Sequence, residues 1–223
     1  NNLYTLFFKI LVFSGTIVII YISYEYLKDL SLITPEFFFL ILLSLVGRLV
    51  LISSRNIISM YLGLELQSIC LYILASYRKY DIKSSEAGVK YFITGALSSG
   101  VLLYGLSIIY AFTNSTDFYE ISKSINLSLQ NNENFLIINI GFVLILCGLF
   151  FKIAVVPFHM WAPDVYEGSP TSITAFFTTI PKIGVIAFLI KFLNTTFESY
   201  SDAWFQILYL VSVISMILGS IAA

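Results

Sequence analysis

The 223-residue chain is dominated by apolar side chains, with 58% hydrophobic residues, 11% charged residues and a mean hydropathy of +0.90. Soluble domains carry charges on roughly a quarter of their residues, so a water-soluble fold of this length would leave too much apolar surface in water. The formal charge of −1 excludes the clustered basic face that nucleic-acid binding needs. These values predict a polytopic membrane protein.

About seven apolar segments are long enough to cross a membrane, which takes about 20 residues. In chain order they are 3–24, 37–52, 57–76, 88–112, a segment that begins at 135, 172–193 and 204–223. Polar connections separate them, the longest at 113–134. Because lipid cannot satisfy backbone hydrogen bonds, all the segments are predicted to be helical. The predicted fold is all-α, a transmembrane helical bundle that forms a single domain over 1–223.

The segment that begins at 135 is predicted to be a broken helix. Its apolar run meets Lys152 and then Pro157, which removes a backbone donor and crowds the preceding turn. Broken helices at membrane depth are tolerated only beside protein or a wet cavity, and they mark ion sites in transporters. The alternative is that the helix ends at Lys152 and a surface loop follows, although Phe158 is apolar for a loop.

The two cysteines and the single histidine do not form a redox or metal centre. Cys70 and Cys147 lie inside apolar runs, with no second cysteine or histidine at metal-ligand spacing. His159 alone cannot supply a pair of haem ligands. We therefore predict no metal site and no cofactor in this chain.

Three ionisable residues, Glu65, Lys152 and Lys182, lie well inside apolar segments. A charge at the centre of a bilayer costs about 2.5–3.5 kcal/mol on insertion scales. One acid and two bases in a dry interior predict a proton relay, in which the position of the carboxylate decides whether a lysine holds its proton. The alternative is a static ion pair that only joins helices. For Arg48 and Lys9, snorkelling or local pairing is expected instead.

The two lysines are expected to differ in role. Lys152 lies at the predicted break, where water has access, so we expect it to pair with Glu65 as the switch. Lys182 follows Thr178 by one turn on the same helix face, in an uninterrupted apolar segment. We therefore expect Lys182 to be the drier lysine and to relay protons onward.

The motifs around these residues resemble a known family. Residues 151–171 read FKIAVVPFHMWAPDVYEGSPT, and two shorter runs, 63–68 and 87–96, read GLELQS and AGVKYFITGA. Together they resemble the antiporter-like subunit 2 of NADH:ubiquinone oxidoreductase (respiratory complex I), most of all its mitochondrial members. The resemblance covers about 37–223, whereas 3–24 matches only in character. It presents the chain as an N-terminal or split portion, with the first inverted repeat at about 37–193 and a further helix at about 204–223.

The resemblance implies a proton-translocating membrane-arm subunit, which couples electron transfer from NADH to ubiquinone with proton pumping. Glu65, Lys152 and Lys182 fall on the family's half-channel positions, and three further residues are implied in support, namely Pro157, His159 and Thr178. Two alternatives remain open, a component of a multisubunit cation/proton antiporter and a non-pumping structural subunit of the membrane arm.

The resemblance also implies partners for this chain. NADH, FMN, iron–sulfur clusters and ubiquinone would belong to partner subunits. Other membrane-arm subunits, membrane lipids and a separate chain that carries the second repeat would surround it, with no nucleic acid. The implied location is the mitochondrial inner membrane, or alternatively the bacterial plasma membrane.

Overall fold

The computed structural model describes residues 2–30, 34–131 and 135–222, and these ranges are almost entirely helical. In chain order the elements are α1 (Asn2–Asp29), α2 (Pro35–Ser53), α3 (Ile57–Ala75), α4 (Ile82–Thr113), α5 (Phe118–Asn131), α6 (Phe135–Ile153), α7 (Trp161–Gly168), α8 (Thr171–Thr196), the short 3-10 helix η1 (Glu198–Tyr200) and α9 (Ser201–Ala222). Within the described ranges, 7 helices are long and apolar enough to cross a membrane. The predicted all-α transmembrane bundle is therefore confirmed.

Two membrane-length helices extend beyond the apolar segments that predicted them. α1 continues to Asp29, and α4 begins at Ile82 rather than at 88. Polar residues outside the hydrocarbon core can continue a helix into water, so hydropathy alone underestimates helix length. The start of α4 is fixed by a cap, because the carboxylate of Asp81 accepts a hydrogen bond from the backbone N–H of Lys83 at 3.1 Å.

The helix α5 was not predicted, because it lies inside the polar connection at 113–134. Its buried residues Phe118, Ile121 and Ile125 recur at three- and four-residue spacing, and they pack into the core beside α8. The carboxylate of Asp117 accepts a hydrogen bond from the backbone N–H of Tyr119 at 2.9 Å, which caps the helix. An amphipathic helix of this kind has too few apolar residues to appear as a membrane segment.

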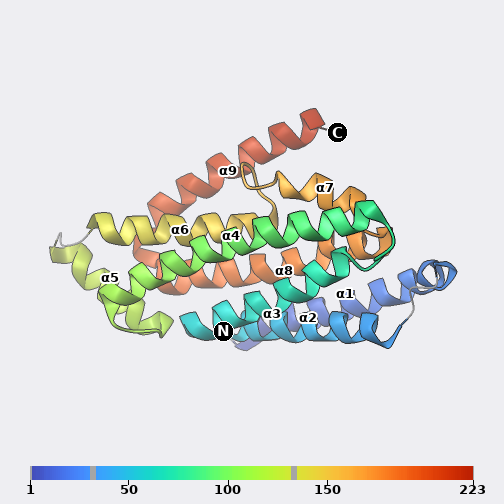
Figure 1. The fold of residues 1–223 in the computed structure, drawn as a ribbon. Helices are drawn as coiled ribbons and strands as arrows, with labels where there is room; N and C mark the ends of the chain where they lie inside the picture. Colours follow the sequence, from blue (N-terminus) through green and yellow to red (C-terminus); the bar gives the residue numbers. More distant parts are fainter. Residues whose placement is uncertain (1, 31–33, 132–134, 223) are drawn as a thin grey trace.

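The long helices pack side by side, with α2 against α3, α4 against α6, and α1 against α8 (Figure 1). A close approach of two helix backbones joins α2 and α3 at Gly47 and Gly63. A methyl group on Gly63 would lie 2.9 Å from the carbonyl oxygen of Gly47, so a larger side chain there meets backbone directly. Small residues that let helix backbones approach are a common means of packing within membranes.

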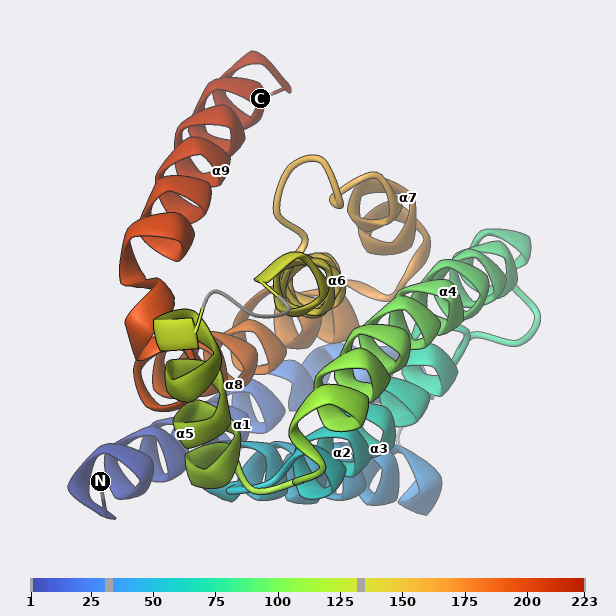
Figure 2. The same cartoon turned by 90° about the vertical axis from the view of Figure 1, so that its left-hand side faces the viewer.

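The last helix departs from the bundle. Figure 2 shows α9 leaning away from α6 and α7, and it packs near η1 and the end of α8. It also contacts the break after α6, where the hydroxyl of Ser215 accepts from the backbone N–H of Val156 at 3.2 Å. Its apolar side chains Tyr209 and Met216 are 69% and 66% exposed. This face therefore meets either lipid or further polypeptide in the membrane.

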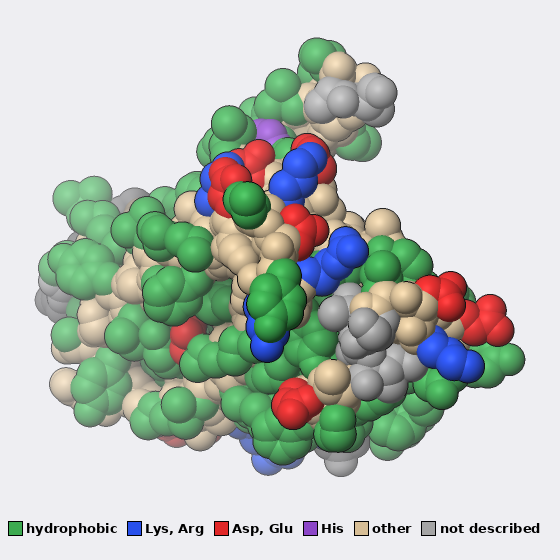
Figure 3. All heavy atoms as spheres, turned by 45° about the vertical axis from the view of Figure 1, so that its right-hand side comes forward, with side chains coloured by type: hydrophobic (Ala, Val, Ile, Leu, Met, Phe, Trp, Pro, Cys, Tyr) green, Lys and Arg blue, Asp and Glu red, His purple; other side chains and the backbone are tan. Residues whose placement is uncertain are grey.

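Charged side chains gather at the end of the molecule that carries α7 and the start of α4, whereas the flanks are mainly hydrophobic (Figure 3). Four ion pairs occur there among the described residues, one of them between Arg78 and Asp81 at 3.7 Å. Lys90 contacts Asp164 at 2.7 Å and Glu86 at 2.8 Å, and Lys83 contacts Glu167 at 3.0 Å. Two of these pairs join α4 to α7.

Candidate functional site

The predicted helix break is present. α6 ends at Ile153, and α7 begins only at Trp161. Between them the chain turns sharply, with Ala154 at a φ of 62° and a cis bond before Pro157. The indole N–H of Trp161 donates to the carbonyl oxygen of Phe151 at 3.1 Å, so one carbonyl freed at the helix end finds a new donor. The stretch is therefore a broken helix with a second short helix after the break, rather than a surface loop.

Packing against α4 holds α7 in place. A methyl group on Gly168 would lie 2.6 Å from the carbonyl oxygen of Lys83, so the end of α7 touches the backbone of α4. Together with the ion pairs of Lys83 and Lys90, this contact fixes the segment after the break.

Lys152 occupies the centre of the site. Its side chain points from the last turn of α6 between α3 and α4, and the residue is only 9% exposed. The ammonium donates to Ser68 at 2.9 Å, to Ser99 at 3.0 Å and to Tyr72 at 3.4 Å. Since the hydroxyl of Ser68 donates its own proton to Leu64, its lone pairs remain available for the lysine. Three hydroxyl oxygens therefore match the three N–H groups of the ammonium.

Glu65 lies in the same region. It precedes Ser68 by one turn of α3, it is half-buried, and its charge acts on Lys152. No ion pair joins the two among the described residues, and the buried Oε1 of Glu65 has no hydrogen-bond partner. The arrangement is a separated pair, in which the carboxylate is near the ammonium but does not touch it.

Lys182 lies apart from this pair. Its Nζ is 5.5 Å from the centroid of the Tyr166 ring on α7, and the side chain is half-buried. The expectation that Lys182 is the drier lysine is therefore wrong in this structure. The physical reason is that α3 and α4 enclose Lys152, whereas Lys182 turns toward α7, at the edge of the described bundle.

The three supporting residues differ in position. Pro157 and Met160 line an apolar cavity of about 270 Å³ beside the break. His159 is half-buried in the same turn, and its Nδ1 is buried with no hydrogen-bond partner. Thr178 is exposed, and its hydroxyl donates to the carbonyl oxygen of Ala175 at 3.1 Å. The structure thus places His159 and Pro157 at the break and leaves Thr178 outside the site.

Arg48 was expected to snorkel or to pair locally. It pairs locally through one hydrogen bond, to Ser44, but it does not snorkel. The residue is 0% exposed, and Nη2 donates to Ser44 at 2.7 Å while the guanidinium lies 4.6 Å from the ring centroid of Phe176. Its Nε and Nη1 are buried without a partner. Snorkelling fails because Arg48 lies near the middle of α2 and faces α3 and α8, so its side chain has no route to the interface.

No group of three histidine, cysteine or acidic side chains suited to a metal ion occurs in the ranges that the structure describes. The titratable side chains in this region are Glu65, Lys152, His159 and Lys182.

The chain is similar to several known proteins. The family model for the transmembrane part of NADH:quinone oxidoreductase and Mrp antiporters matches residues 54–223. NADH-quinone oxidoreductase subunit N of Pelagibacter ubique is 48% identical over 217 residues, a match that covers 97% of this chain and 45% of the relative. The chain thus spans about half the length of the curated relatives that it matches.

Two solved structures also resemble the chain. A chain of respiratory complex I from Thermus thermophilus with bound Aureothin superposes with a TM-score of 0.73 and 29% identity, over 98% of this chain and 44% of that one. The Mrp complex from Dietzia sp. DQ12-45-1b gives a TM-score of 0.56 at 22% identity over 67% of this chain and 28% of that one, a likeness of fold alone. The family model covers well over half of the residues, and the chain therefore belongs to the NADH:quinone oxidoreductase/Mrp antiporter transmembrane family.

Proposed function

We propose that the chain is a proton-translocating subunit in the membrane arm of an NADH–quinone oxidoreductase. The observation that carries the proposal is the buried lysine at the helix break, Lys152, whose ammonium is enclosed by three hydroxyls. Glu65 lies one turn before Ser68, which supplies one of these hydroxyls. The similarity to subunit N of Pelagibacter ubique supports the choice of complex.

In this proposal Glu65 controls the proton on Lys152. Two opposite charges at 4 Å attract by about 4 kcal/mol at an effective dielectric constant of 20, and by less than half of that at about 10 Å. A shift of the carboxylate over this range would change the proton affinity of the lysine by more than about tenfold. The separated pair of the structure corresponds to the state in which the lysine is readier to lose its proton.

Lys182 is the next acceptor in the proposed route. It faces Tyr166 on α7, beyond the break. In the sequence, the turn that contains His159 lies between the two lysines. The Nδ1 of His159 is buried in this turn without a hydrogen-bond partner, and we assign it to the same route. Thr178 is left out of the route, because its hydroxyl is engaged by its own helix.

The redox groups of the complex belong to partner subunits in this proposal. NADH, FMN, iron–sulfur clusters and ubiquinone would react there, and conformational or electrostatic changes would reach Glu65 from outside the chain. The exposed apolar face of α9 supports a further partner in the membrane, since side chains such as Met216 are about two-thirds exposed. We assign that place to the second inverted repeat, on a separate chain or on the same one.

The membrane that houses the complex is proposed to be either the mitochondrial inner membrane or the bacterial plasma membrane. The motif at 151–171 favours the mitochondrial assignment by its resemblance, whereas the relatives compared above are bacterial. Fractionation of the source cells, followed by detection of the chain with an antibody, distinguishes the two.

The experiment that tests the function replaces the controlling carboxylate. Glu65→Gln keeps the size and the hydrogen-bonding groups of the side chain but removes its charge. In the assembled complex we expect lower proton pumping and lower NADH–quinone reductase activity, by about tenfold, with normal assembly. The matched control is Glu120→Gln, at an exposed position of α5, which we expect to be without effect.

The result also separates the alternatives. Full activity with normal pumping in Glu65→Gln would return Glu65 to a structural role and favour a non-pumping subunit. Cation exchange across vesicles without any dependence on NADH would instead favour an antiporter component.

A further inference from the structure

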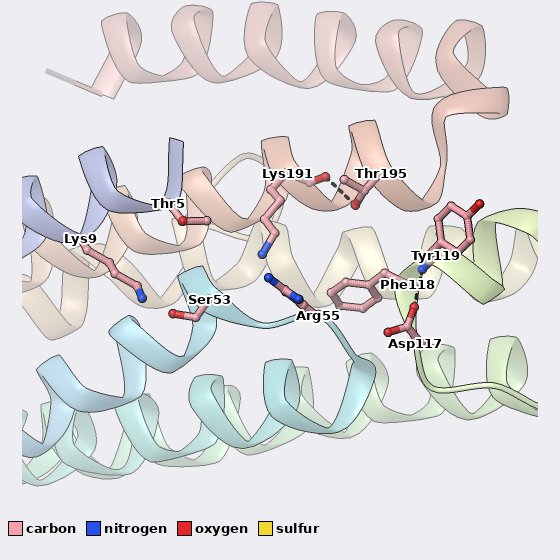
Figure 4. Close-up of a pocket in the computed structure, with 9 residues that line it drawn as sticks. All are labelled: Thr5, Lys9, Ser53, Arg55, Asp117, Phe118, Tyr119, Lys191 and Thr195. Carbon is pink, nitrogen blue, oxygen red and sulfur yellow. Dashed lines mark hydrogen bonds between the residues drawn. The ribbon is translucent and has the colours of Figure 1, made fainter. Parts of the chain in front are cut away.

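A second polar site lies at the opposite end of the bundle from α7. It is a cavity of about 540 Å³ where the first half of α1, the connection between α2 and α3, the start of α5 and the end of α8 meet (Figure 4). Its lining combines three cationic side chains with hydroxyls and one carboxylate, namely Lys9, Arg55, Lys191, Thr5, Ser53, Thr195 and Asp117, together with the rings of Phe118 and Tyr119.

The three cations come from three different segments and converge on the cavity. The ammonium of Lys191 points toward the guanidinium of Arg55, and the side chain of Lys9 extends toward Ser53 (Figure 4). Lys191 is repelled by both Arg55 and Lys9. Such clustering of like charges is unfavourable unless an anion neutralises it.

The protein itself supplies little of that neutralisation. Lys191 donates to the carbonyl oxygens of Ile52 at 3.2 Å and Ser54 at 2.6 Å, which cover the end of α2 and leave one N–H free. Neither Lys9 nor Arg55 forms an ion pair within the described residues. The carboxylate of Asp117 instead accepts from the backbone of Tyr119. Three cations therefore face a single carboxylate.

The position and the surroundings of the cavity indicate which anion it would bind. α2 ends at Ser53 and α3 begins at Ile57, so the cavity lies where membrane helices end, at the depth of lipid headgroups. Leu6 and Phe13, one turn on either side of Lys9 along α1, are 55% and 51% exposed. An acyl chain would lie along this face while its phosphate reaches the cations.

We propose that Lys9, Arg55 and Lys191 form a binding site for the phosphate group of an anionic phospholipid. Arg55 supplies paired N–H donors that suit phosphate oxygens, and the two lysines supply point charges. The hydroxyl of Ser53 also lines the cavity, but it donates its proton to the carbonyl oxygen of Leu49 at 2.6 Å, so the three cations supply the donors. Free inorganic phosphate shares the same chemistry but would gain nothing from the apolar face of α1.

The test uses the full chain, purified with its accompanying subunits, and native mass spectrometry with added phosphatidylglycerol. The variant Lys9→Gln/Arg55→Gln removes two cations without a large change in size. Each basic residue near a membrane surface contributes about 1 kcal/mol, so we expect binding of phosphatidylglycerol to weaken about 30-fold. Lys9→Gln alone is expected to weaken it about fivefold, which keeps the test valid if the double variant assembles poorly.

The matched control is Lys28→Gln/Lys79→Gln, which removes two exposed cations that do not line the cavity. We expect unchanged binding in this control, and weak binding of neutral phosphatidylcholine in every variant. Equal binding of phosphatidylglycerol by the wild type and both Lys9 variants would overturn the proposal. Full displacement of the lipid by an excess of inorganic phosphate would overturn the lipid as the source of the phosphate, and persistence of the lipid would support it.

Discussion

At the scale of single residues, the two buried cations Lys152 and Arg48 differ in how fully their N–H groups are hydrogen-bonded. Lys152 has a hydroxyl oxygen for each of its N–H groups, whereas Arg48 leaves Nε and Nη1 without partners. A lysine that is solvated by hydroxyls can hold or release a proton with little rearrangement. An arginine stays charged at any accessible pH, so Arg48 acts as a fixed charge between α2 and α8.

Lys152 and Lys182 are predicted to differ in their importance for proton pumping. We predict that Lys152→Met lowers NADH-driven proton pumping by about tenfold or more, because it removes the proton carrier next to Glu65. Lys182→Arg keeps a positive charge at the half-buried position and should lower pumping by less. The measurement is proton uptake by proteoliposomes at matched amounts of assembled complex. A larger loss in Lys182→Arg than in Lys152→Met would contradict the assigned order.

Sequence patterns predict candidate residues for proton transfer more readily than they predict the surroundings of those residues. Glu65, Lys152 and Lys182 stand out because a charge inside an apolar run is costly. Their degree of burial was not predictable, since it depends on which neighbour each helix face meets. The same limit explains why snorkelling was wrongly predicted for Arg48. The sequence does not reveal that α2 turns the face with Arg48 toward α3 and α8.

At the scale of helices, the fold depends on close backbone contacts between α2 and α3. This contact positions Glu65 and Ser68, because α3 carries both toward α4 and α6. Hydropathy predicted the membrane helices and proline chemistry predicted the break after Lys152, since both are local properties of the sequence. The amphipathic α5 was not predicted, because its few apolar residues are buried only through packing against other helices, which the sequence does not reveal.

The contact between α2 and α3 gives a prediction about stability. Gly63→Ala would place a methyl group 2.9 Å from the carbonyl oxygen of Gly47, so the helices must separate. We expect a loss of about 1–3 kcal/mol in the free energy of unfolding, seen as a lower melting temperature in detergent. The control is Gly100→Ala, where nothing lies within 4 Å of the added methyl group. Equal melting temperatures for the two variants would show that the close contact is unimportant.

At the scale of the whole molecule, the chain has a well-packed interior and an unpacked side. The core beside Lys152 is buried by α3, α4 and α6, whereas α9 and much of α1 expose apolar side chains. Hydropathy alone does not distinguish a lipid-facing helix from one that faces another subunit. The position of α9 relative to the other helices could therefore not be predicted from the sequence.

Assembly is predicted to be required for function. An apolar face beside intramembrane charges needs protein partners to exclude lipid and to complete a proton path. We expect blue-native electrophoresis of gently solubilised membranes to find the chain only in a large assembly of many subunits. A stable monomer that transports protons in detergent-free vesicles would contradict this expectation.

The central claim is that Glu65 and Lys152 act as one unit in proton transfer. The most direct measurement is the number of protons pumped per NADH oxidised in four forms of the assembled complex, namely wild type, Glu65→Gln, Lys152→Met and the double variant. Groups that work as a unit are non-additive, so the double variant should lose no more than the more damaging single change. Losses that multiply in the double variant would show that the two residues act independently and would contradict the account.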